Sequence, residues 1–94
     1  MLSKRHRRVD RQIREKINEL EKRIIQHEHE ADIYKGRMDV LYETFEKETN
    51  QLEKEKIQGS INYCVHSMNY HIRKSDKLGE RMEGLEIALK ILNQ

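Results

Sequence analysis

The side chains of this chain best suited to chemistry are a single cysteine and five histidines. Cys64 with His66 or His71 has the residue types of a nucleophile activated by a base. Cys64, however, falls at an apolar position of a helical repeat, where a thiol is expected to be buried and unreactive. The sequence also contains no glycine-rich phosphate loop and no oxyanion-hole motif. We therefore expect that the protein is not an enzyme.

The histidines do not have the spacing of a metal site. His27 and His29 are two residues apart, which places them on different faces of a helix. His66 and His71 are five apart, a poorer chelating spacing than four, and no second cysteine completes a zinc set. We expect no metal and no other cofactor. His27 and His71 are better interpreted as polar residues in a helical seam that help to fix its register.

Positive charge is concentrated at the N-terminus. Residues 1–16 carry seven basic and two acidic residues, although the net charge of the whole chain is only +2. This basic arm, residues 1–12 leading into a helix, favours nucleic-acid phosphates or an acidic protein surface as its partner. Alternatively, it is a solubilising N-terminus that binds nothing. The expected contact residues are Lys4, Arg5, Arg7, Arg8, Arg11 and Arg14.

A basic stretch that runs into a heptad repeat resembles a basic leucine zipper in outline. The resemblance covers about 25 residues and consists of the order of the two parts, a basic region followed by a zipper. The asparagine and small residues with which that family contacts bases are absent from this stretch. No base-reading residue is therefore inferred, and an electrostatic, salt-dependent affinity for phosphate is what remains.

Two series of mostly apolar residues, each alternating steps of four and three, predict two long helices of a coiled coil. The first series is Ile13, Ile17, Leu20, Ile24, His27, Ala31, Tyr34, Met38, Leu41, Phe45, Glu48 and Leu52. The second is Ile57, Ile61, Cys64, Met68, His71, Ser75, Leu78, Met82, Leu85, Leu89 and Leu92. The two series are out of phase, and Gly59-Ser60 suits a turn between them. We predict helix 1 at about 6–57 and helix 2 at about 60–93, the second unbroken through Ser75–Gly79.

The short turn predicts a single all-α domain, residues 1–94, folded as an antiparallel helical hairpin. With these boundaries, the first helix overhangs the second by residues before about 23. The overhang leaves an apolar stripe without a partner in its own chain, which predicts a homodimer that forms a helical bundle. The expected dimerisation residues are Ile13, Ile17, Leu20 and Ile24. The sequence leaves a parallel and an antiparallel dimer equally open.

The second helix has an outer face rich in residue types that anchor protein interfaces. Tyrosine, arginine and asparagine stand where a solvated helix more often carries Glu, Lys and Gln. Alternatively, the tyrosines lean over the edge of the seam and the amides are simply exposed. The predicted partner-binding residues are Tyr63, His66, Asn69, Tyr70, Arg73 and Lys74.

The function expected from these features is stoichiometric binding of a larger protein or nucleoprotein by a small modulator, adaptor or inhibitor. Such economy suits a protein encoded by a phage, another virus or a mobile element. One alternative is a dimer that binds DNA or RNA through the basic arm, and another is a structural coiled-coil subunit. A lone cysteine, no secretory signal and no apolar run of the roughly 20 residues that span a membrane predict a cytoplasmic protein.

Overall fold

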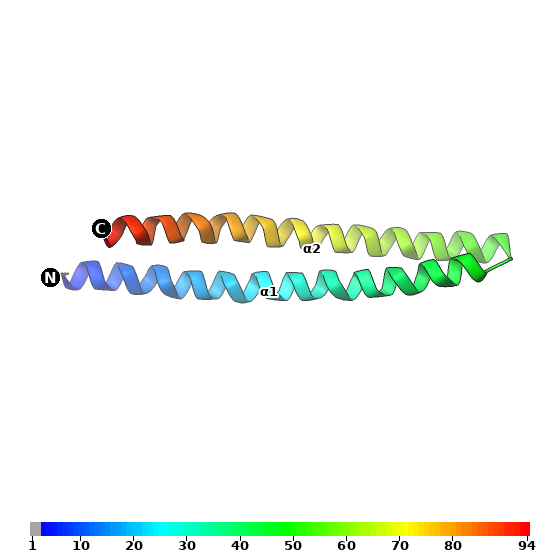
Figure 1. Cartoon of the computed structure of the whole chain (residues 1–94), viewed down its shortest axis with the longest axis horizontal. Coiled ribbons are helices and arrows are strands. Elements are labelled where there is room, and N and C mark those ends of the chain that lie inside the picture. Colours follow the sequence, from blue (N-terminus) through cyan, green and yellow to red (C-terminus); the bar gives the residue numbers. More distant parts are fainter. Residues whose placement is uncertain (1–2) are drawn as a thin grey trace.

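Two long antiparallel helices joined by a short turn make up the protein in the computed structural model, which describes residues 3–94 (Figure 1). Helix α1 spans Lys4–Lys47 and helix α2 spans Gln51–Leu92. The hairpin extends over 73 × 14 × 14 Å, and the N- and C-terminal ends lie side by side at one end of it. The predicted all-α antiparallel hairpin is confirmed. Helix α2 also runs unbroken through Ser75–Gly79, as expected.

The seam between the helices follows the two heptad series. Each residue of both series is buried or half-buried, with the exception of Leu52, which is 61% exposed. The residues most protected from solvent are Leu20, Ile61, Leu78, Cys64 and Ala31. A two-helix hairpin has only one such layer of side chains, so its folding depends on this continuous strip rather than on a three-dimensional core.

The turn lies at residues 48–50, which makes the predicted turn at Gly59-Ser60 wrong. The Glu48 carboxylate accepts hydrogen bonds from the backbone N–H groups of Thr49 (3.1 Å) and Asn50 (3.0 Å). The Asn50 side chain caps α2 by accepting from the N–H of Glu53 at 3.1 Å. Gly59 lies within α2 instead, where a Cβ atom would meet nothing within 4 Å. An exposed glycine can thus remain helical where a capping residue upstream has already started the helix.

Moving the turn by ten residues changes which residues face each other and removes the predicted overhang. His27 lies level with His71, and Tyr34 with Tyr63. Helix α2 consequently reaches the N-terminal end of α1 and covers the stripe that was expected to be free. The residues assigned to dimerisation face α2: Leu20 is 1% exposed, and Ile13, Ile17 and Ile24 are half-buried. Dimerisation remains a prediction, but this stripe no longer supports it.

The open end of the hairpin is held by polar contacts between α1 and the residue that ends α2. Asn93 donates from its side-chain amide to Asp10 Oδ2 at 2.7 Å, and its Oδ1 lies 3.3 Å from His6 Nε2. Arg14 donates to the other Asp10 oxygen at 2.7 Å. The hydrogen bond from Arg14, which has the largest effect, and the one from Asn93 hold the pKa of Asp10 below its ordinary value. Part of the arm that was expected to extend freely is therefore attached to α2.

The position of the turn can be tested with two alanine substitutions whose effects have opposite signs. Asn50→Ala removes the cap of α2 and should lower the free energy of unfolding by about 1 kcal/mol. Gly59→Ala places a better helix former at an exposed helical position and should raise it by about 0.5–1 kcal/mol. Urea titration followed by circular dichroism measures both. A stabilising Asn50→Ala together with a destabilising Gly59→Ala would contradict this fold.

Candidate binding surfaces

Halfway along the seam, two histidines replace the apolar pairs found elsewhere. The Nδ1 atoms of His27 and His71 lie 2.8 Å apart, with ring centroids 5.1 Å apart. At this distance one ring nitrogen donates a hydrogen bond and the other accepts it, so at least one imidazole is neutral. Partial burial, followed by the charges of His71, Arg23 and Lys74, lowers the pKa of His27. Both histidines occupy the seam, as expected, but their pairing was missed because it depends on the position of the turn.

A tyrosine cluster lies beside the histidine pair, towards the turn. The Tyr34 ring stacks on His71 at 6.0 Å and meets Tyr63 edge-on at 6.1 Å. Arg37 lies 5.4 Å from the centroid of the Tyr34 ring. The hydroxyl of Tyr63 beside it raises the pKa of Tyr34. Tyr63 therefore covers the edge of the seam while 62% of its surface stays exposed.

The hairpin has two long sides flanking the seam, and one of them, the basic side, is rich in cations. In α1, positions seven residues apart form a stripe that carries Lys16, Arg23 and Arg37, interrupted by Glu30. The facing stripes of α2 carry Lys74, Lys77 and Arg81. Towards the turn the same side becomes apolar and aromatic, with Val40 62%, Tyr63 62% and Tyr70 49% exposed. A shallow groove opens there, lined by Gly36, Arg37, Val40, Leu41, Ser60 and Cys64.

The opposite side, the acidic side, carries the reverse charge over the middle of the hairpin, whereas at the open end it bears cations of the basic arm. Its carboxylates are Glu21, Glu28, Asp32, Asp39, Glu46, Asp76, Glu83 and Glu86, and its cations are Lys4, Arg7, Arg11, Arg14, Lys35 and Lys90. Several of the carboxylates line two hollows beside the seam, one of which also includes the partly exposed Ile72 and the other Arg14. Towards the turn this side carries the exposed Tyr42 and the half-buried Val65. The acidic side is therefore cationic at the open end, mainly acidic beyond Arg14, and partly apolar near the turn.

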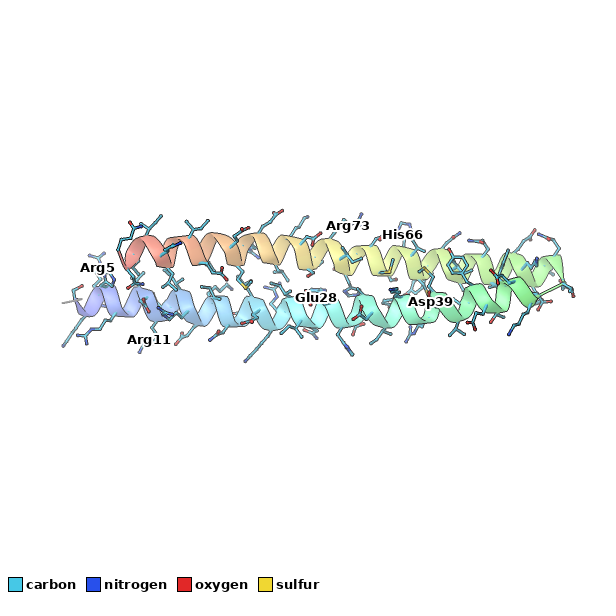
Figure 2. The ribbon with its side chains drawn as sticks, in the orientation of Figure 1. Arg5, Arg11, Glu28, Asp39, His66 and Arg73 are labelled. Atoms are coloured by element: carbon cyan, nitrogen blue, oxygen red, sulfur yellow. The ribbon has the colours of Figure 1, made fainter. Side chains whose placement is uncertain are left out.

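The predicted partner-binding residues lie on three parts of the surface of α2: the basic side, the outer ridge and the acidic side. Tyr63, Tyr70 and Lys74 belong to the basic side, where the Lys74 ammonium lies 5.6 Å from the Tyr70 ring centroid. His66 and Arg73 point away from α1 along the outer ridge of α2 (Figure 2). Asn69 lies beyond that ridge, in line with Asp76 seven residues later on the acidic side. Arg73 still borders the basic side, because it lines a surface hollow with Tyr70, Lys74 and Lys77.

The basic arm is helical from Lys4 onward and forms the first turns of α1. Lys4, Arg7, Arg8 and Arg11 line one open hollow, and Arg5 is exposed nearby. Arg11 approaches Glu15 only at 3.9 Å, and both side chains are about 70% exposed, so their ion pair contributes little to stability. Arg14 differs because it is held by Asp10. The arm therefore offers a cluster of solvated cations, with Arg14 in a structural contact.

The candidates for catalysis and metal binding do not converge. Cys64 is buried in the seam, whereas His66 points outward from the opposite surface of α2 (Figure 2). Within residues 3–94, no three His, Cys, Asp or Glu side chains are placed to share a metal ion. Neither of the two described helices contains a stretch apolar enough to cross a membrane.

Comparisons with protein-family models, with curated proteins and with solved structures find no match for this chain.

The histidine pair predicts a dependence of stability on pH. The pKa of His27 is lowered in the folded protein, so unfolded chains bind more protons just below the ordinary value of 6.5. The stabilising contribution of neutral His27 is complete above pH 6.5 and is lost as the pH falls through 6.5 towards the lower folded pKa. Thermal melts between pH 8 and about pH 5 should show this loss. His27→Gln should reduce the dependence, whereas the exposed control His29→Gln should leave it unchanged; equal effects would contradict the assignment.

Proposed function

We propose that the protein is a non-enzymatic binding protein that holds another macromolecule against its basic side. The observation that carries this proposal is the gathering of cations and exposed tyrosines from both helices on one side of the hairpin. Tyr70 and Tyr63 present large rings to solvent beside Lys74 and Arg37. Rigid aromatic side chains and arginines are the residue types that contribute most to protein interfaces.

The properties of the basic side indicate what kind of partner it fits. A row of cations near the open end favours an acidic surface and speeds association with it. The apolar groove near the turn fits a small apolar side chain between Val40 and Ser60. We therefore infer a protein partner whose contact surface is acidic over part of its length and apolar over the rest. A modulator, adaptor or inhibitor that acts by occupying such a surface remains the favoured role.

A second candidate function is binding of DNA or RNA through the basic arm. It is favoured by the hollow in which Lys4, Arg7, Arg8 and Arg11 lie together at one end of the rod. These side chains fit phosphates spaced along a backbone, and an affinity of this kind falls steeply as salt rises.

The protein-binding proposal is tested by site-specific photo-crosslinking in the cells that produce the protein. A photoreactive amino acid at Tyr70 should yield a discrete covalent adduct, because this ring lies at the centre of the proposed contact. The same amino acid at His29, exposed on the outer surface of α1, is the matched control. Adducts of equal yield at both positions, or none at position 70, would overturn the proposal. Mass spectrometry of the adduct distinguishes another protein from a second copy of this chain.

The nucleic-acid candidate is tested by titrating a duplex with the wild type and with a variant in which Arg5, Arg7, Arg8 and Arg11 are alanine. Each lost phosphate contact should reduce the slope of log K against log salt by about 0.9. The melting temperature should hardly change, because these arginines are exposed and Arg14 is kept. An unchanged slope in the folded variant, or no binding by the wild type at low salt, would exclude the arm as a nucleic-acid site.

A further inference from the structure

The acidic and basic sides of the hairpin are complementary to each other in charge and in position along its axis. Because His27 lies level with His71, Arg23 lies level with Lys74 and Lys16 with Arg81 on the basic side. By the same register, the carboxylates of Glu21, Glu28, Asp76 and Glu83 occupy nearly the same stretch of the acidic side. Both charged clusters therefore lie mainly between the level of Arg14 and the histidine pair, beyond the cations of the basic arm.

The apolar parts of the two sides also lie level with each other, between the histidine pair and the turn. On the basic side they comprise Tyr70, Tyr63 and Val40, and on the acidic side Ile72, Val65 and Tyr42. Five of the exposed large apolar side chains (Val40, Tyr42, Tyr63, Tyr70 and Ile72) thus lie on this part of the two sides, whereas Val9, Ile25 and Ile91 lie nearer the open end. An unpartnered apolar surface of this kind is a candidate for a protein contact.

We propose that the partner of the basic side is the acidic side of a second copy of this chain, aligned in parallel and in register. This arrangement sets the cations of one copy against the carboxylates of the other between the basic arm and the histidine pair, and apolar residues against apolar residues near the turn. The inference rests on the proposed function, since it names the occupant of the same basic side. One side, about 73 by 14 Å, offers on the order of 1,000 Å², compared with the ~800 Å² that each partner buries in a stable complex.

The other pairings of two hairpins are less favourable for electrostatic reasons. Two basic sides, or two acidic sides, aligned in parallel bring like charges together, which costs several kcal/mol when such charges are close. An antiparallel copy places charged residues of one chain against the apolar half of the other and leaves them desolvated without partners. Parallel contact between unlike sides leaves one acidic and one basic side free at the ends of each pair. Such a contact can therefore add further copies and form a row or a closed ring.

The test uses two folded variants that each carry like charges on both sides. In E28K/D32K/D76K both sides are basic, and in R23E/K74E/R81E both are acidic. In sedimentation velocity at low salt, the wild type should form species heavier than the 11.4 kDa chain, and added salt should dissociate them. Each variant alone should sediment as one chain, and an equimolar mixture should regain the heavier species because unlike sides can alternate again. The control E15K/E43K/E80K makes the same change in net charge as E28K/D32K/D76K, but on the outer surfaces, and should associate like the wild type.

The possible outcomes separate this inference from the proposed function. A wild type that sediments as a single chain at low salt and high concentration overturns self-association. Association of either variant alone, or no recovery on mixing, overturns it equally, because the contact then lies elsewhere. If the crosslink from position 70 joins a different protein while the wild type sediments as one chain, the proposed function stands without this inference. If the control variant also fails to associate, net charge rather than these two sides governs the assembly, and the inference is wrong.

Discussion

The position of the turn is the constraint on which the rest of the hairpin depends. Glu48 and Asn50 satisfy backbone N–H groups that the end of one helix and the start of the next leave without partners. Once α2 begins at Gln51, every cross-helix pair is determined, because both helices follow the same heptad spacing. The histidine pair, the contact of Asn93 with Asp10 and the alignment of the charged sides all follow from this register. A turn ten residues later would have removed all three.

The seam was predictable because its signal is periodic and repeated. Eleven positions of α1 and the turn region and twelve of α2 were assigned to it from spacing alone, and Leu52 is the one that lies exposed. Many weak preferences for burial add together along such a stripe, so one polar residue such as His27 does not hide the pattern. The all-helical hairpin followed from the same periodicity and from the absence of proline.

The turn was harder to predict because two local signals compete for it. Gly59-Ser60 is a common helix stop and start, but an exposed glycine costs a long helix only about 1 kcal/mol. The competing signal is Asn50 followed three residues later by Glu53, a capping pattern that precedes the glycine. Glu48 belongs to the predicted seam by its spacing, but its carboxylate accepts hydrogen bonds at the turn. The wrong turn also affected the candidate surfaces. The type of each residue could be read from the sequence, but its neighbours on the other helix could not be predicted without the correct turn.

The contact between the two ends of the chain, at the open end of the hairpin, has a practical consequence for labelling the molecule. Because Asn93 contacts His6 and Asp10, the two ends of the described chain emerge together beside the cationic first turns of α1. A fluorescent protein or affinity tag joined to either end would therefore crowd the basic arm. Thr49, in the turn at the far end of a rod 73 Å long, offers an attachment point for a small dye that is remote from the arm. A pair of small dyes, one at each end of the rod, would report whether neighbouring molecules lie in the same or in opposite directions.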